Sequence, residues 1–155
     1  MKIYVLSDTH NSFSFGAFLP ELEKADMIVH CGDGERDVYD IKSAFSVPIV
    51  SVAGNCDMFG DSSTVFEAEG HRILVAHGHN YGVRYSLSEL EEKAQAENAD
   101  IVFYGHTHIP QTDYRNGRWY INPGSLCRPR EGNAPTYCIL TLDKFKVYPE
   151  MKIWM

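Results

Sequence analysis

Side chains that can bind a metal ion gather at five places in this chain, each just after a short apolar run. The apolar runs cover residues 3–6, 27–29, 49–52, 73–75 and 101–103. The clusters that follow them are Asp8-Thr9-His10, Gly32-Asp33, Gly54-Asn55-Cys56-Asp57, His77-Gly78-His79 and Gly105-His106-Thr107-His108. Because an open α/β sheet presents its ligand site at the ends of its strands, this repetition predicts one shared site.

The candidate ligands combine carboxylate and amide oxygens with imidazole nitrogens and include no thiolate. They are Asp8, His10, Asp33, Asn55, His77, His106 and His108. Such mixed donors suit Mn²⁺, Fe²⁺ or Zn²⁺ better than Ca²⁺ or a thiolate-rich structural zinc ion. Seven ligands are more than one octahedral ion takes while leaving room for water. We therefore expect two divalent metal ions that share a carboxylate, with Mn²⁺ as the first choice and Zn²⁺, Fe²⁺ and Ni²⁺ as alternatives.

The spacing within two of the clusters indicates how their ligands converge. Residues two apart in an extended segment point to the same side, so Asp8 can face the same cleft as His10. The same reasoning brings His106 and His108 together. Glycines in four of the clusters permit sharp turns and a close approach of the backbone to the ions.

Three segments between the apolar runs have helical character, namely residues 15–24, 35–45 and 86–98. The last one begins with Ser86 and has Glu89 three positions later, the pattern of an N-terminal capping box. Strands that alternate with helices indicate βαβ units and parallel pairing. Three further predicted strands, at residues 118–121, 136–142 and 146–148, have no helix between them, which favours antiparallel pairing. Two sheets packed face to face with helices outside would satisfy both halves of a single domain, residues 1–155.

Length and composition narrow the class of protein. At 155 residues the chain suits one domain, and its 44% apolar content is ordinary for a globular protein. No apolar stretch is long enough to span a membrane and no signal peptide is evident, so we expect a cytoplasmic protein without a membrane partner. The four scattered cysteines are expected to be free thiols. The net charge of −7 argues against general nucleic-acid binding, although two bound cations would still attract a phosphate ester.

The order of the five clusters resembles that of the calcineurin-like metallophosphoesterases. The compact length, the variant Gly54-Asn55-Cys56-Asp57 and the later Asn122-Pro123-Gly124-Ser125 resemble the small microbial phosphodiesterase branch of that family. The resemblance extends from residue 3 to about residue 142. It implies an α/β fold of four layers, an αββα sandwich of two mixed β-sheets flanked by helices.

The resemblance also implies a role for each candidate ligand. Asp8, His10 and His108 would bind the first metal ion, and Asp33 would bridge both ions. Asn55, His77 and His106 would bind the second. The implied chemistry is hydrolysis of a phosphate ester by a metal-bound hydroxide that attacks in line with the leaving oxygen.

The residue that protonates the leaving group is left open by the sequence. The wider family has a histidine for this purpose at the position of Cys56. A thiol is a poorer proton donor, and nearby cations would favour its deprotonated thiolate form. Either Cys56 is not the general acid, or the enzyme prefers leaving groups that depart without being protonated. His79 is the other candidate acid, with packing beside the site as its alternative role. Asp57 completes the candidate catalytic group, and we expect it to support the turn and its neighbours.

Several other polar and aromatic residues lie near the clusters. We expect His30 to pack or to orient Asp33, and His71 to lie in solvent. Arg128 and Arg130 are interpreted as surface residues, with contact to a phosphate as the alternative. Four aromatic residues are expected to pack and have stacking on a base as the alternative: Phe13, Phe15, Tyr81 and Tyr85.

The function that the sequence favours is a dinuclear metal-dependent phosphodiesterase acting on a small phosphate ester. A phosphomonoesterase differs only in pocket details, which a sequence does not reveal. A non-catalytic scaffold is the alternative from another class, because a related-looking eukaryotic trafficking protein keeps this fold without evident need for catalysis. The complete ligand set favours the enzyme. A nuclease would need an extended basic groove, which the composition does not offer. Self-association into a homo-oligomer fits so small an enzyme, but no apolar stripe identifies an interface.

Overall fold

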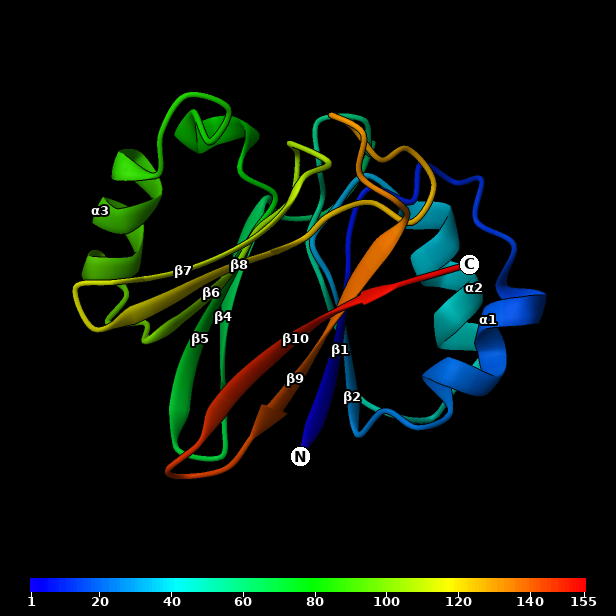
Figure 1. Ribbon diagram of the computed structural model, residues 1–155, viewed down its shortest axis with the longest axis horizontal. Helices are drawn as coiled ribbons and strands as arrows, with labels where there is room; N and C mark the ends of the chain where they lie inside the picture. The colour runs from blue at the N-terminus through cyan, green and yellow to red at the C-terminus, as the bar shows by residue number, and fades with distance from the viewer.

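The computed structural model describes residues 1–155 and arranges ten strands in two five-stranded sheets with three α-helices outside them (Figure 1). The strand orders are β10-β9-β1-β2-β3 and β4-β5-β6-β8-β7. Helices α1 and α2 cover one sheet and α3 covers the other. The expected αββα sandwich of two mixed sheets is thereby confirmed. None of the helices is long and apolar enough to cross a membrane.

The first sheet contains both ends of the chain. Its strands are β1 (Lys2–Leu6), β2 (Met27–His30), β3 (Ile49–Ser51), β9 (Thr136–Leu142) and β10 (Val147–Ile153). Strands β1, β2 and β3 are parallel, whereas β9 is antiparallel to both β1 and β10. The parallel crossovers are made by α1 (Phe15–Leu22) and α2 (Glu35–Ala44).

The second sheet is built around three parallel strands, β5 (His71–Ala76), β6 (Ile101–Phe103) and β8 (Arg118–Pro123). Strands β4 (Ser63–Ala68) and β7 (Pro110–Arg115) pair antiparallel at its two edges. A 3₁₀-helix, His79–Tyr81, and α3 (Ser88–Ala96) connect β5 to β6.

The core lies in three layers, one between the sheets and one under the helices on each side. The middle layer joins Val5 and Val29 of the first sheet to Val75 and Phe103 of the second, all with 0% exposure. Full burial of such a side chain contributes roughly 1.5–3 kcal/mol. This packing fixes the carboxyl ends of β1, β2, β5 and β6, after which the metal-competent clusters follow.

Some of the sequence-based predictions about elements are wrong in detail. The edge strands β4 and β7 were not expected, because their residues are mostly half-buried or exposed and both strands are defined by pairing with a neighbour. Strand β10 extends to Ile153, beyond the predicted residues 146–148. The capping box does not form either. The amides of Tyr85 and Ser86 both donate to the carbonyl of Gly82 in a turn, so that α3 begins at Ser88.

Candidate metal centre

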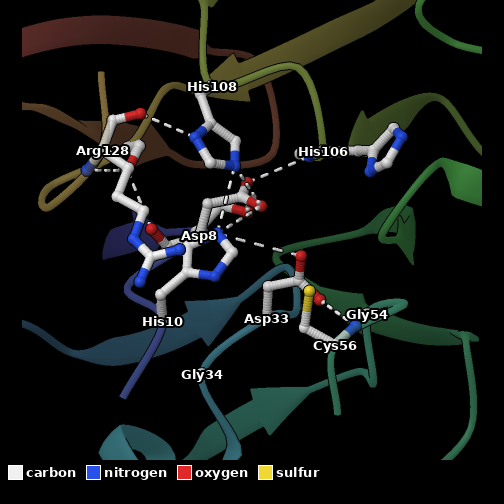
Figure 2. A network of polar contacts seen from close by, with 12 residues as sticks. Asp8, His10, Asp33, Gly34, Gly54, Cys56, His106, His108 and Arg128 are labelled. Atoms are coloured by element: carbon white, nitrogen blue, oxygen red, sulfur yellow. Dashed lines mark hydrogen bonds and ion pairs between the residues drawn. The ribbon is translucent and has the colours of Figure 1, made fainter. Parts of the chain in front are cut away.

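The candidate ligands come together where the loops of the two sheets meet. Asp8 N donates to the carbonyl of Gly32 (3.0 Å) and His10 N to that of Asp33 (2.7 Å), which ties the loops after β1 and β2. His106 N donates to Asp8 Oδ2 (3.0 Å) and connects the second sheet to the first. Figure 2 shows Asp8 between His108 and Asp33, with Cys56 beside Asp33.

The backbone of this centre is strained at the candidate ligands themselves. Five of the seven have a positive φ, namely Asp8 (54°), His10 (53°), Asp33 (59°), His106 (72°) and His108 (62°). Non-glycine residues in this region cost of order 1–3 kcal/mol each and cluster at functional sites. The ligands therefore converge through left-handed turns. The extended segments expected from the sequence are absent, although their consequence, convergence, holds.

The first group of candidate ligands consists of Asp8, His10 and His108, whose ligand atoms all lie within 4.8 Å of one another. His108 Nε2 is 3.2 Å from Asp8 Oδ1, and His10 Nε2 is 3.1 Å from His108 Nε2. His108 Nδ1 lies 2.6 Å from the carbonyl of Arg128, to which it donates. That bond leaves the lone pair of Nε2 free to face the centre.

The second group consists of Asp33, His77 and His106, again within 4.8 Å. His77 Nε2 is 3.3 Å from Asp33 Oδ2 and 3.3 Å from His106 Nδ1. His77 Nδ1 donates to the carbonyl of Cys31 (2.8 Å), which presents the lone pair of Nε2 to the centre. Asn55 Oδ1 lies 3.0 Å from the same Nε2.

Asp33 lies between the two groups. Its Oδ2 is 3.9 Å from His10 Nε2, in the first group, and 3.3 Å from His77 Nε2, in the second. Its Oδ1 accepts a hydrogen bond from the amide of Cys56 (2.8 Å). A carboxylate in this place can contact an ion in either group, as bridging requires.

The donor set fits divalent cations. Asp8 Oδ1 is fully buried and has no hydrogen-bond partner, yet imidazole nitrogens of His10, His77 and His108 lie 3.2–3.9 Å from it. A buried carboxylate oxygen without a partner is costly, and a cation among these donors removes that cost. Carboxylate and imidazole ligands without thiolate suit first-row ions such as Mn²⁺, Fe²⁺ and Zn²⁺.

The protonation states of three candidate ligands suit metal binding, and His77 is the exception: burial lowers its pKa, but the hydrogen bond to Asp33 and the charge of Asp8 raise it, so a metal ion would have to displace a proton there. Burial opposes ionisation of Asp8 and Asp33, but the imidazoles of His108 and His77, when protonated, outweigh it and lower the pKa of both carboxyl groups; cations in place of those protons would act in the same direction. Burial, aided by the charges of His77 and Arg84, lowers the pKa of His106 to about 4. At neutral pH the carboxylates are ionised and His106 is neutral, which are the forms that bind metal ions.

The loop after β3 places its three polar residues in different surroundings. Asn55 and Cys56 are exposed, and the Cys56 sulfur forms a third group of metal-competent atoms with His10 and Asp33. Burial and the charge of Asp33 raise the pKa of the Cys56 thiol. Asp57 instead accepts four backbone hydrogen bonds, a supporting position like the one expected for it.

His79 lies next to the second group. Its ring centroid is 5.3 Å from that of His77 and 6.2 Å from that of His106, and its buried Nδ1 has no hydrogen-bond partner. Burial and the charge of His77 lower the pKa of His79. The position is compatible with either expected role, so the function of His79 as an acid stays a prediction.

Two histidines outside the ligand set connect loops. His30 Nδ1 accepts from the amide of Gly32 (3.1 Å), so Nε2 donates to Thr9 Oγ1 (2.9 Å) and fastens the β1 loop to the β2 loop. His71 was expected to lie in solvent, and this expectation is wrong. Its Nδ1 is 2.6 Å from Asp100 Oδ2 and its Nε2 is 2.8 Å from the carbonyl of Asp143.

Sequence reasoning missed several residues that support the centre. Ser7 Oγ donates to Asp8 Oδ2 (2.6 Å), and Ser125 Oγ donates to the carbonyl of Asp8 (2.8 Å). Arg84 Nε donates to His106 Nε2 (3.1 Å). Ser125 belongs to the motif at residues 122–125 that was noted in the sequence, whereas Arg84 had no local signal.

Comparison with known proteins assigns the family. The model of the calcineurin-like phosphoesterase superfamily domain matches residues 1–144, so the chain belongs to this superfamily. The chain is similar to the probable metallophosphoesterase YsnB of Bacillus subtilis, with 33% identity over 147 residues that cover 92% of this chain and 85% of that protein.

Two solved structures are informative about the range of this fold. The phosphoesterase YfcE of Escherichia coli, which is named a phosphodiesterase, has a TM-score of 0.70 and 25% identity, covering 91% of this chain and 88% of that one. Wild-type Vps29 of Entamoeba histolytica, complexed with Zn²⁺, has a TM-score of 0.80 and 21% identity, covering 98% of both chains. At that identity the likeness to Vps29 shows the fold alone.

Proposed function

We propose that this metallophosphoesterase is a dinuclear, metal-dependent phosphodiesterase that hydrolyses a small phosphate ester. The main support is the pair of three-residue ligand groups, with the Asp33 carboxylate between them and the buried, partnerless Asp8 Oδ1 beside it. The assignment of each residue to an ion and the choice of Mn²⁺ belong to this proposal.

In this proposal, Asp8, His10 and His108 would hold one ion, Asn55, His77 and His106 would hold the other, and Asp33 would contact both. Two divalent cations in such a site supply an activated water molecule and neutralise charge on the phosphoryl group. The chain keeps the ligand lone pairs aimed at the centre through the carbonyls of Cys31 and Arg128.

Two side chains at the centre can deliver a proton to the leaving oxygen. Burial and the charge of Asp33 raise the pKa of the Cys56 thiol, which favours a proton on the sulfur, whereas two cations beside it would favour the thiolate. His79 has its pKa lowered, so it is mostly neutral and donates less readily unless substrate charge raises that pKa. We therefore expect a preference for diesters with good leaving groups, whose departure needs little proton transfer.

The alternative from another class is a non-catalytic scaffold that keeps this fold. Binding of a metal ion does not separate the two functions, because a scaffold can also keep metal ligands. Turnover does separate them, and the complete set of candidate ligands in this chain favours an enzyme.

The test is a panel of Mn²⁺, Zn²⁺, Fe²⁺ and Ni²⁺ with bis(4-nitrophenyl) phosphate and 4-nitrophenyl phosphate. We expect the diester to be hydrolysed faster, with the highest rate in Mn²⁺. Asp33→Ala should abolish turnover, whereas Asp61→Asn, which changes an exposed acid on the neighbouring loop, should not. Equal rates for wild type and Asp33→Ala with every metal would refute the enzyme and favour the scaffold.

A further inference from the structure

A pocket of about 250 Å³ lies directly beside the candidate metal centre. It is lined by Arg84, Thr107, Ile109, Arg130 and Glu131. Thr107 and Ile109 alternate along the chain with the candidate ligands His106 and His108. The pocket therefore shares its wall with the loop that carries two of the ligands.

Both arginines of the pocket are attached to that loop. Arg84 Nε donates to His106 Nε2 (3.1 Å), so one side chain contacts both the pocket and the second ligand group. Arg130 is held through its backbone, whose amide donates to the carbonyl of His108 (3.4 Å). The guanidinium of Arg130 is not used in this attachment.

The positive charge of the pocket is not neutralised by ion pairs. Neither Arg84 nor Arg130 forms an ion pair, although Arg72 and Arg115 elsewhere in the chain do. Glu131 also lines the pocket and offsets one of the two charges, so the lining remains positive in a chain whose net charge is −7. Arginine presents a planar set of donors that matches the oxygens of a phosphate group.

The size of the pocket limits what it can hold. Pockets that enclose a whole small ligand usually measure about 300–1,000 Å³. The volume of about 250 Å³ suits one substituent of a substrate whose reacting phosphoryl group lies at the metal centre. It does not provide the extended basic groove that a polynucleotide needs.

We propose that the pocket of Arg84 and Arg130 binds a second phosphoryl group of the substrate, so that the preferred diesters carry a phosphate besides the one that is hydrolysed. This inference rests on the proposed function and specifies its substrate class. Arg130 acts as the specificity-determining residue. Arg84 contributes as well, but its contact with His106 couples any change there to the metal centre.

The test compares two substrates that differ by one phosphate. These are the 4-nitrophenyl ester of thymidine 5′-phosphate and the same ester with an added 3′-phosphate. We expect the wild type to have a kcat/KM at least about tenfold higher for the second ester. In Arg130→Gln the kcat/KM for that ester should fall by about ten- to a hundredfold, as loss of a charge-assisted hydrogen bond predicts, while the first ester changes less than twofold.

Lys144→Gln is the matched control, because it removes one exposed positive charge from the turn between β9 and β10, at the opposite end of the sheet from the metal centre. It should leave both rates unchanged. Calorimetry of thymidine 3′,5′-bisphosphate against thymidine 5′-phosphate gives a readout independent of turnover, with the same expected loss of preference in Arg130→Gln.

The outcomes separate the two proposals. Absence of hydrolysis of both esters by the wild type would refute the proposed function, while the calorimetric preference still reports on the pocket. Hydrolysis of both esters without a preference for the added phosphate, or an equal loss on both esters in Arg130→Gln, would overturn the pocket assignment alone.

Discussion

The carboxylate of Asp57 connects two loops of the centre. Asp57 lies in the loop after β3, and it accepts hydrogen bonds from the loop after β2, which carries Asp33. Its Oδ2 accepts from the amides of Asp33 (2.7 Å) and Gly54 (2.8 Å), and its Oδ1 accepts from those of Gly34 (3.0 Å) and Glu35 (3.1 Å). Glu35 is also the first residue of α2, so the negative charge lies at a helix N-terminus, where it is favourable. The informative perturbation is Asp57→Asn, which keeps the size of the side chain.

The expected loss of stability in Asp57→Asn follows from the number of amides that the carboxylate accepts from. Asparagine offers one oxygen and one NH₂ group, so two of the four amides lose their acceptor and face a donor. Each hydrogen bond to a charged group is worth about 1.5–3 kcal/mol, and solvent compensates part of the loss at this half-buried site. We expect the free energy of unfolding to fall by about 2–4 kcal/mol, which lowers the Tm of a domain of this size by about 5–15 °C.

The same change should weaken metal binding, because two of the four bonds that hold Asp33 and its neighbouring backbone lose their acceptor. Loss of such a supporting contact typically costs 10–100-fold in metal affinity or activity. The assays are thermal unfolding with and without a chelator, calorimetric titration with Mn²⁺, and kcat at saturating metal. Asp61→Asn on the same loop is the control. If stability and metal affinity are unchanged while kcat falls, Asp57 acts on the substrate and the positioning role is wrong.

Three further predictions concern histidine and cysteine side chains. If His79 is the general acid, His79→Gln should lower kcat by about 10²–10⁴-fold with metal affinity retained, and an unchanged kcat rules out this role. With Cys56 as the only other donor, a nitrophenyl diester should be hydrolysed far faster than an alkyl phosphate; equal rates contradict the expected need for a good leaving group. Burial opposes protonation of His71, but its hydrogen bond to Asp100 and contact with Asp143 raise its pKa. The stabilisation from protonated His71 is complete below the unfolded pKa of about 6.5 and is lost as pH rises through the higher folded pKa. In urea unfolding, His71→Gln should therefore lose more free energy of unfolding relative to the wild type at pH 6 than at pH 9. A deficit independent of pH would contradict it.

Much of the fold could be predicted because apolar runs and their spacing encode it locally. The runs at residues 3–6 and 101–103 are buried strands, and the alternation with helices gives the parallel pairs β1–β2 and β5–β6. Edge strands such as β7 carry no such signal. Its residues 110–115 are mostly polar and half-buried or exposed, and only pairing with β8 makes them a strand.

The sequence by itself determined which residue types follow the strands, and therefore that the oxygen and imidazole candidate ligands collect at one edge of a sandwich. Strand ends in parallel pairs lie at the same edge, so this conclusion needs no coordinates. Only the tertiary structure decided how the ligands face one another. The tautomer of His77 depends on the carbonyl of Cys31, 46 positions away, and the position of Asp8 depends on Ser125, 117 positions away. Contacts between residues so distant in sequence arise from the packing of two sheets, and no local pattern records them.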